Sequence, residues 1–271
     1  MKASTYFCTF NINTHSIMIT LISPAKTLDF TNISTPQQTL PRLLTKTNKL
    51  IRTARTLKTH DLKQLMSISD DLATLNVQRF KDFRQKHTIE NSKTAIHAFK
   101  GDVYLGLDVD SLTNQDIDFA QSQLRMLSGL YGLLRPLDLI QPYRLEMGTS
   151  LKVEDNNGLY QFWGDDIAKL VMKDLKEGGD HVILNLASNE YFKSLKSKKL
   201  KAKVIDVDFL DLKNGKYKVI SFFAKKARGM MSRYIIKNRI NDPKDLVGFD
   251  IDGYYFDSSS SQENKLVFKR D

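Results

Sequence analysis

Residues 17–22 read Ile-Met-Ile-Thr-Leu-Ile and are followed at once by the polar stretch Ser23-Pro24-Ala25-Lys26-Thr27. A short apolar run rich in β-branched residues that ends at a Ser-Pro pair predicts a buried strand. The other strand-like segments lie far downstream, at residues 181–186, 203–210, 217–224, 254–256 and 266–269. Asn214-Gly215, a pair typical of hairpin turns, joins the second and third of them. We therefore expect the N-terminal strand to join a sheet built largely by the second half of the chain.

The segments between these strands carry apolar residues at helical spacing. Helices are predicted from Thr39 and Pro41, from Thr59, around residues 94–100, from Thr113 to Leu127, and over residues 161–175 and 229–240. The sequence has no internal repeat and no Pro-, Gly- or Ser-rich linker. We predict a single domain over residues 18–271, mixed α/β or α+β in class, with a helix-rich first half.

Composition excludes several classes of function. The 271 residues include one cysteine, Cys8, and five histidines that lie far apart, so the sequence predicts no disulfide framework, no Cys-based zinc site and no dithiol redox pair. No stretch approaches 18 consecutive apolar residues, which excludes a membrane span. We expect a cytoplasmic protein without a metal or cofactor, and without a membrane partner.

Residues 1–17 differ from the rest of the chain. They lack the continuous apolar segment of a secretory signal and the arginines of a transit peptide. We interpret them as a non-core extension, and Met18 as a residue that could itself start the protein.

Positive charge is concentrated in residues 191–240. This segment holds 15 Lys and Arg but three Asp, a net charge of +12, whereas the whole chain carries +10. A single-sign region on a nearly neutral body is the footprint of a polyanion binder, although a solvated lysine-rich surface has the same composition.

Three short constellations could carry chemistry. The first is the loop after the N-terminal strand, where Ser23, Lys26 and Thr27 could bind a phosphate or carboxylate.

The second constellation spans residues 118–144 and resembles a helix-hairpin-helix element around Leu127-Ser128-Gly129-Leu130-Tyr131-Gly132. Such hairpins offer backbone N–H groups to DNA phosphates, and a plain αα-corner fits the same pattern. The DNA-binding candidates here are Ser128, Gly129 and Gly132 with the nearby Arg125, Arg135 and Arg144.

The third constellation is residues 221–229, which we expect to form a strand-to-helix junction. Lys225, Lys226 and Arg228 would repel one another there unless an anion binds between them. Two flanking cations, Lys193 and Arg233, complete the DNA-binding candidates.

Longer blocks of the sequence resemble the YaaA family of bacterial peroxide-stress proteins. The blocks are ITLISPAKTLD at 19–29, FKGDVY at 99–104, the whole of 124–148, LYQFWG at 159–164, NLASNEYFK at 185–193 and FAKKARGMM at 223–231. The resemblance begins at Met18 and implies a cytosolic protein that limits peroxide and iron damage. It also implies a single domain with a helix-hairpin-helix element that binds double-stranded DNA.

Two functions follow from these patterns. Thiol peroxidases need a reactive cysteine and ferroxidase bundles need Glu-x-x-His pairs, and residues 18–271 contain neither, so any protection must be indirect. The first hypothesis is non-sequence-specific binding of duplex DNA. The second is an enzyme for a small anionic or nucleotide substrate, with Glu190 as its acid or base, whose pocket would gather Ser23, Lys26, Asn185, Ser188, Glu190, Tyr191, Lys193 and Lys225.

Deleting residues 1–17 should leave the melting temperature nearly unchanged, because this segment has no periodic apolar face to pack on the domain. Thermal unfolding of the full chain and of a chain starting at Met18 measures the effect. A large drop in melting temperature after truncation would show that the segment belongs to the core.

Overall fold

The central strand β1 (Met18–Ile22) is buried along its whole length in the computed structural model, which describes residues 18–31, 37–176 and 182–271. Four of its five side chains are apolar and fully inaccessible to solvent. A strand buried on both faces is typical of a parallel sheet that helices cover on both sides. The parallel neighbours are β5 (Leu124–Ser128) and β8 (Val182–Leu186). The predicted extension, residues 1–17, lies outside the described residues.

Eight strands form the main sheet of the described chain, in the order β11-β12-β9-β8-β1-β5-β6, with β10 paired to β9. The strands β12, β9, β8, β1 and β5 are parallel, whereas β6, β10 and β11 run antiparallel to their neighbours. The bounds of the others are β6 (Gly132–Leu134), β9 (Lys203–Lys213), β10 (Lys216–Lys218), β11 (Tyr255–Phe256) and β12 (Lys265–Arg270). The expected mixed α/β class, with a sheet supplied mainly by the second half, is confirmed.

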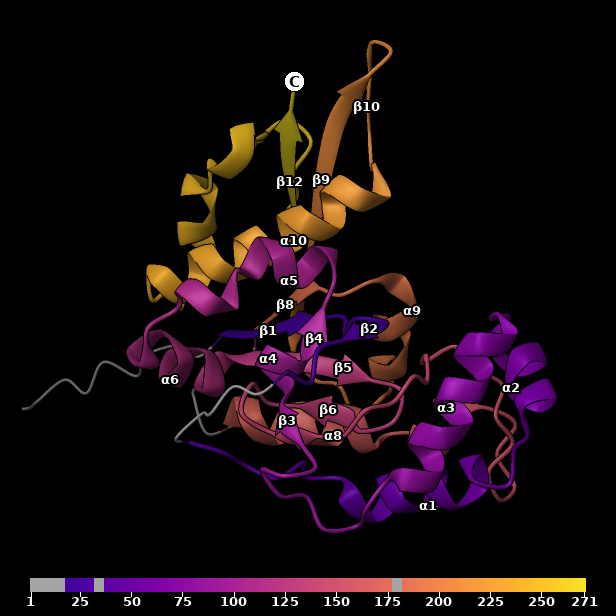
Figure 1. The fold of residues 1–271 in the computed structure, drawn as a ribbon. Helices are drawn as coiled ribbons and strands as arrows, with labels where there is room; N and C mark the ends of the chain where they lie inside the picture. The colour runs from indigo at the N-terminus through magenta and orange to yellow at the C-terminus, as the bar shows by residue number, and fades with distance from the viewer. Residues whose placement is uncertain (1–17, 32–36, 177–181) are drawn as a thin grey trace, which may run out of the picture.

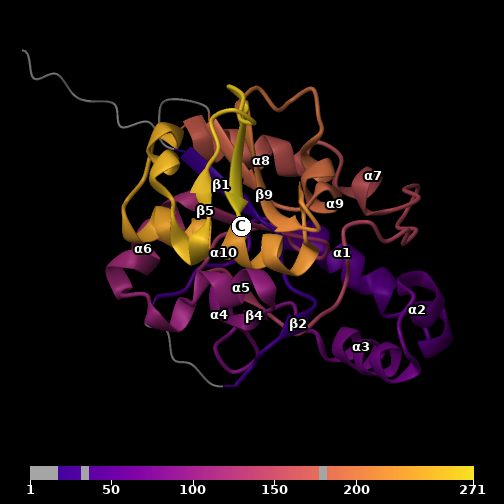
Figure 2. The ribbon, with the colours of Figure 1, turned by 90° about the horizontal axis from the view of Figure 1, so that it is seen from above.

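Helices cover both faces of this sheet. Figure 2 shows α8 (Asp166–Lys176) on one side of β1 and β9, and α10 (Ser221–Lys237) with α5 (Asp102–Leu107) on the other. The remaining α-helices are α1 (Leu44–Ala54), α2 (Thr59–Met66), α3 (Asp70–Asp82), α4 (Ala95–Ala98), α6 (Asn114–Gln123), α7 (Leu159–Trp163) and α9 (Asn189–Phe192). Two further pairs of short strands tie loops together, β2 (Thr27–Leu28) with β4 (Phe99–Lys100) and β3 (Lys93–Thr94) with β7 (Leu139–Ile140). No helix among the described residues is both long and apolar enough to cross a membrane.

The helix-hairpin-helix element predicted over residues 118–144 is not present there. The helix that begins at the Thr113 capping box ends at Gln123, and the chain then forms a β-hairpin of β5 and β6. The cause is tertiary, because residues 124–126 extend the sheet by pairing with Thr20, Leu21 and Ile22 of β1.

A helical hairpin does occur elsewhere, where the second predicted helix divides into α2 and α3 at Ser67, whose φ is +52°. The N-terminus of α3 carries Asp70 and Asp71, which would repel a phosphate, so this hairpin does not suit phosphate binding.

The third constellation also folds differently from the prediction. Residues 221–229 lie entirely within α10, which begins at Ser221, so there is no strand-to-helix junction in the middle of the basic run. The predicted hairpin turn is confirmed: Asn214 and Gly215 both have positive φ, and they connect β9 to a β10 that ends at Lys218.

Two glycines set the distance between α5 and α10. A Cβ atom on Gly106 would overlap the carbonyl oxygen of Lys226, and one on Gly229 would overlap that of Val103. The two backbones are therefore in direct contact, which a residue with a side chain would prevent. This contact places Lys225 and Arg228 beside the start of α5.

Replacing Gly229 by Ala should lower the free energy of unfolding by about 3 kcal/mol, because the new methyl group must push two backbones apart. Alanine is a better helix former than glycine by about 1 kcal/mol, which is too little to offset that clash. Denaturant titration of both proteins gives the difference.

Gly248→Ala is the matched control, since a Cβ there meets only the hydroxyl of Tyr234, at 3.0 Å, which can move away. A Gly229→Ala protein as stable as the wild type would disprove the close helix crossing.

Candidate functional site

A cavity of about 460 Å³ lies where β1 and β8 end. Ser23 directly follows β1, and Ser188 follows β8 after one intervening residue. The chain passes from β1 to β5 on one side and later returns to β8 on the other, so this is a topological switch point of a parallel sheet. Ligands of such sheets bind in the crevice at the carboxyl ends of the strands at that point. The position of the cavity in the fold thus identifies it as the candidate site.

Hydrogen bonds to Ser23 connect the end of β1 to the end of β8 and to α5. The backbone N–H of Ser188 donates to Oγ of Ser23 over 2.9 Å. The hydroxyl of Tyr104 donates to the carbonyl oxygen of Ser23 over 3.3 Å. Pairing of β2 with β4 places Lys26 and Thr27 beside Lys100 and Gly101. The floor of the cavity is therefore built from backbone that the sheet fixes in place.

Carboxylates occupy one part of the wall. Glu146 lies 3.1 Å from Nζ of Lys26, and its other oxygen accepts hydrogen bonds from Arg144. Glu190 accepts a hydrogen bond of 2.9 Å from the backbone N–H of Gly148. Both carboxylates are held in place, and hence can accept hydrogen bonds from a bound molecule at defined positions.

Helix α10 supplies the cationic part of the wall through Lys225 and Arg228. Nζ of Lys225 lies 3.8 Å from Asp102 at the start of α5, and half of the lysine side chain is exposed. All the predicted anion-pocket residues (Ser23, Lys26, Thr27 and Glu190), together with Lys225, line this single cavity. From the predicted enzyme pocket, Ser188 and Tyr191 join them, whereas Asn185 lines a neighbouring hollow.

A comparison with protein families matches most of the chain. The family model of the peroxide stress protein YaaA matches residues 18–260. The chain belongs to the YaaA family of peroxide stress proteins. The match begins at the first residue of β1 and includes every element that lines the cavity. In this YaaA-family protein the cavity is thus part of the family domain itself.

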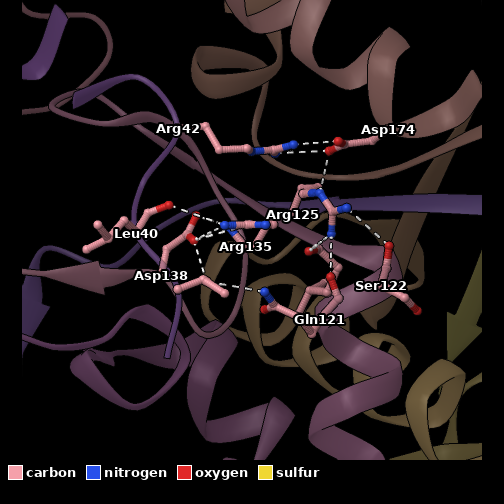
Figure 3. Close-up of polar contacts among 10 residues, drawn as sticks. Leu40, Arg42, Gln121, Ser122, Arg125, Arg135, Asp138 and Asp174 are labelled. Atoms are coloured by element: carbon pink, nitrogen blue, oxygen red, sulfur yellow. Dashed lines mark hydrogen bonds and ion pairs between the residues drawn. The ribbon is translucent and has the colours of Figure 1, made fainter. Parts of the chain in front are cut away.

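Three arginines predicted to contact DNA are instead engaged inside the protein, as Figure 3 shows for two of them. Arg125 is 5% exposed, forms an ion pair of 2.6 Å with Asp174 and donates to the carbonyl oxygens of Gln121, Ser122 and Leu124. Arg135 pairs with Asp138, which is fully buried, and Arg144 pairs with Glu146. Because each of these arginines is paired with a carboxylate of the protein, we remove them from the DNA-binding candidates.

The predicted hairpin residues are also internal. The Ser128 hydroxyl is buried and shares a hydrogen bond of 2.6 Å with the hydroxyl of Tyr143. A Cβ on Gly129 would overlap the carbonyl oxygen of Leu145, and one on Gly132 would lie 3.0 Å from Leu43 and from the ring of Trp163. These glycines allow backbone and ring packing within the protein, so they are unsuited to contact DNA phosphates.

The other predicted cations lie nearer the surface. Nζ of Lys193 stands 4.8 Å from the centre of the Tyr160 ring. Lys226 lies 3.4 Å from Asp252, and Arg233 lies 3.6 Å from Asp108. Their charges are partly compensated within the protein.

Sequence reasoning missed several residues of the cavity, namely Lys100, Asp102, Tyr104 and Glu146, and assigned Arg228 to DNA alone. The block at 99–104 was noted only for its resemblance, and nothing in its spacing indicates that it meets β1 and α10. Within the described residues, no three His, Cys, Asp or Glu side chains are grouped so that they could hold a metal ion.

Replacing Asp174 by Asn should lower the free energy of unfolding by about 3 kcal/mol, because Arg125 would remain buried without its counterion. Burial alone would raise the pKa of Asp174, but its hydrogen bonds with Arg42 and its ion pair with Arg125 lower the pKa overall. A lowered pKa in the folded state stabilises the protein above about pH 4, the value for an unfolded aspartate, and that gain is lost as the pH falls further. The difference between variant and wild type should therefore shrink in acid, as denaturant titrations at several pH values would measure.

Glu154→Gln is the control, since its pair with Lys49 is exposed and should contribute less than about 1 kcal/mol. Equal stability of Asp174→Asn and wild type at neutral pH would contradict this role for Arg125.

Proposed function

We propose that this YaaA-family protein binds duplex DNA without sequence preference in the cytoplasm, and so limits peroxide and iron damage to it. Bound protein would shield the DNA from oxidants, a route that needs no reactive thiol or metal. The observation that carries this proposal is a projecting hairpin whose lysines have no ion-pair partner among the described residues.

The hairpin of β9 and β10 extends beyond the body of the protein (Figure 1). We call residues 212–219 the arm; every one of them is exposed. The arm carries Lys213, Lys216 and Lys218, and none of the three has an ion-pair partner within 4.0 Å among the described residues. Exposed lysines without counterions are the groups that DNA phosphates can neutralise.

Several other cations of the basic segment are less available, because carboxylates of the protein pair with them. Lys237 and Arg239 both pair with Asp116, and Lys203 pairs with Glu263. Ion pairs thus compensate part of the positive charge of residues 191–240. The lysines of the arm remain available to bind an anion. Lys225 and Lys226 lie just past the base of the arm, near the start of α10, and their weak pairs could exchange for phosphates.

Apolar side chains stand next to these lysines. Val219 and Phe222 are each 53% exposed, and Tyr217 and Phe223 are also exposed. Two-stranded arms that combine cations with exposed apolar groups are suited to DNA, where the cations hold the backbone and apolar groups contact the bases. Contacts dominated by phosphate give affinity without sequence preference.

If the three arm lysines, Lys225 and Lys226 each neutralise a phosphate, the logarithm of the binding constant should fall with the logarithm of salt at a slope of roughly −4 to −5. Replacing Lys213, Lys216 and Lys218 together by Gln should flatten this slope by about 2 to 3 and weaken binding to all sequences alike. Fluorescence anisotropy with two unrelated duplexes over a range of salt concentrations measures both effects.

The matched control is the triple replacement of Lys49, Lys63 and Lys169 by Gln. It removes the same charge from exposed, ion-paired lysines of α1, α2 and α8. The control should keep the wild-type slope. Undetectable duplex binding at low salt, or an equal effect of the two triple variants, would refute the DNA-binding arm.

One observation favours a second candidate, an enzyme acting on a small anionic or nucleotide substrate. The cavity lies at the switch point of the sheet, and Glu190 stands in its wall as the candidate acid or base. The chemistry of the cavity wall defines the ligand class more closely.

A further inference from the structure

Arg228 lies between two hollows of the surface, the 460 Å³ cavity and a second one of about 300 Å³. Its Nε atom is buried and has no hydrogen-bond partner in the described part of the chain. Burial lowers the pKa of its guanidinium, and the nearby Asp208 only partly opposes that effect. A buried guanidinium nitrogen without a partner is costly, and in the wall of a cavity it indicates a site for an anion.

The carboxylates around Arg228 are already engaged. Asp208 lies 2.6 Å from Nζ of Lys265, and Asp206 accepts a hydrogen bond of 2.7 Å from the amide of Asn185. Within the described chain, no carboxylate oxygen comes within 4.0 Å of the guanidinium. By contrast, Lys225 and Lys226 on the same helix each face an aspartate. The charge of Arg228 is therefore left for a ligand.

The surrounding groups specify the kind of ligand. A guanidinium binds phosphate or carboxylate oxygens in pairs, and the hydroxyls of Ser23 and Ser188 can add hydrogen bonds. The wall also holds Glu146 and Glu190, whose oxygens can accept hydrogen bonds from a ligand that carries donors. The ligand must therefore combine an anionic group with hydrogen-bond donors such as hydroxyl or amino groups.

The size of the cavity and the residues of its wall restrict the class of ligand further. A volume of about 460 Å³ falls within the range of about 300–1,000 Å³ that is usual for small-molecule sites. Tyr104 and Tyr191 form part of the wall, with Pro24 and Val103. Such apolar and aromatic surface suits the flat face of a nucleobase.

We propose that the cavity binds a nucleoside monophosphate, with its phosphate at Arg228 and its hydroxyl or amino groups at Glu146 and Glu190. The inference deepens the second candidate function but does not require turnover, because binding is measured directly. It is also independent of the arm, since Arg228 lies in the cavity wall and not on residues 212–219.

Isothermal titration of the full chain with each of the common nucleoside monophosphates tests this assignment. At least one of them should bind, and its nucleoside and inorganic phosphate should each bind roughly tenfold more weakly or worse, because each lacks half of the contacts. Arg228→Gln should weaken nucleotide binding by a similar factor. No binding of any monophosphate at millimolar concentration would overturn the proposal, as would equal binding of nucleoside or inorganic phosphate.

Lys237→Gln is the matched control, because Lys237 is a cation of the same helix that does not line either hollow. This variant should keep the nucleotide affinity within about twofold, and an effect as large as that of Arg228→Gln would overturn the role of Arg228. Without ligand, Arg228→Gln should melt at the wild-type temperature or above, since it removes a buried charge that lacks a partner. A lower melting temperature together with unchanged nucleotide affinity would mean that Arg228 is structural, which also overturns the proposal.

A nucleotide phosphate can come from a free metabolite or from the 5′ end of a DNA strand. Competition by a duplex with 5′-phosphorylated ends, but not by the same duplex with 5′-hydroxyl ends, would identify the DNA end as the source. Binding of the free nucleotide with no competition by either duplex would identify the metabolite. Anisotropy of the arm variant with DNA is a separate measurement, so failure of the DNA proposal and failure of this one can be told apart.

Discussion

The contact between the backbones of α5 and α10 at Gly106 and Gly229 determines the geometry of the candidate site. Each glycine lies where a Cβ would overlap a carbonyl oxygen of the other helix. The short α5 is thereby held against the middle of α10. Helix α5 begins two residues after β4, the strand that pairs with β2. Lys225 and Arg228 consequently face the ends of β1 and β8 across one cavity. If the backbones of α5 and α10 were further apart, Lys225 and Arg228 would not line the same cavity as the ends of β1 and β8.

The number of charged residues in a segment of this protein does not predict how much of their charge is available at the surface. Arg125 looks as available as Lys218 in the sequence, yet it is buried against Asp174 while Lys218 is exposed on the arm. Acidic residues from distant segments neutralise much of the basic run, as Asp116 does for Lys237 and Arg239. Among the described residues, the arm and Arg228 are two places with uncompensated charge, and they differ in shape. A projecting arm suits a polymer with many phosphates, whereas one guanidinium in a cavity suits a small ligand.

The arm and the cavity are linked through α10. The chain leaves β10 at Lys218 and enters α10 at Ser221, and four to seven residues later the same helix presents Lys225 and Arg228 to the cavity. The arm and the cationic wall of the cavity are therefore close together along the chain. This proximity makes the end of a DNA strand a reasonable source of a nucleotide, alongside free metabolites. For a member of the peroxide stress family, binding of DNA at the arm or of a nucleotide in the cavity would be an indirect form of protection.

The sequence by itself determined the features that depend on short-range contacts. The strand at 18–22, the capping box of Thr113 with Asp116 and the turn at Asn214-Gly215 each depend on groups a few residues apart, and all three are present. It also indicated Ser23, Lys26, Thr27 and Glu190 as one pocket, because polar groups at the ends of parallel strands meet at one edge of a sheet.

Only the tertiary structure decided that residues 124–128 form a strand, since the hydrogen bonds that favour this over a helix come from β1, about a hundred residues away. It likewise decided which arginines are neutralised and that Arg228 is not. The physical reason is the same in each case: an ion pair or a ladder of hydrogen bonds needs a partner that only folding brings near.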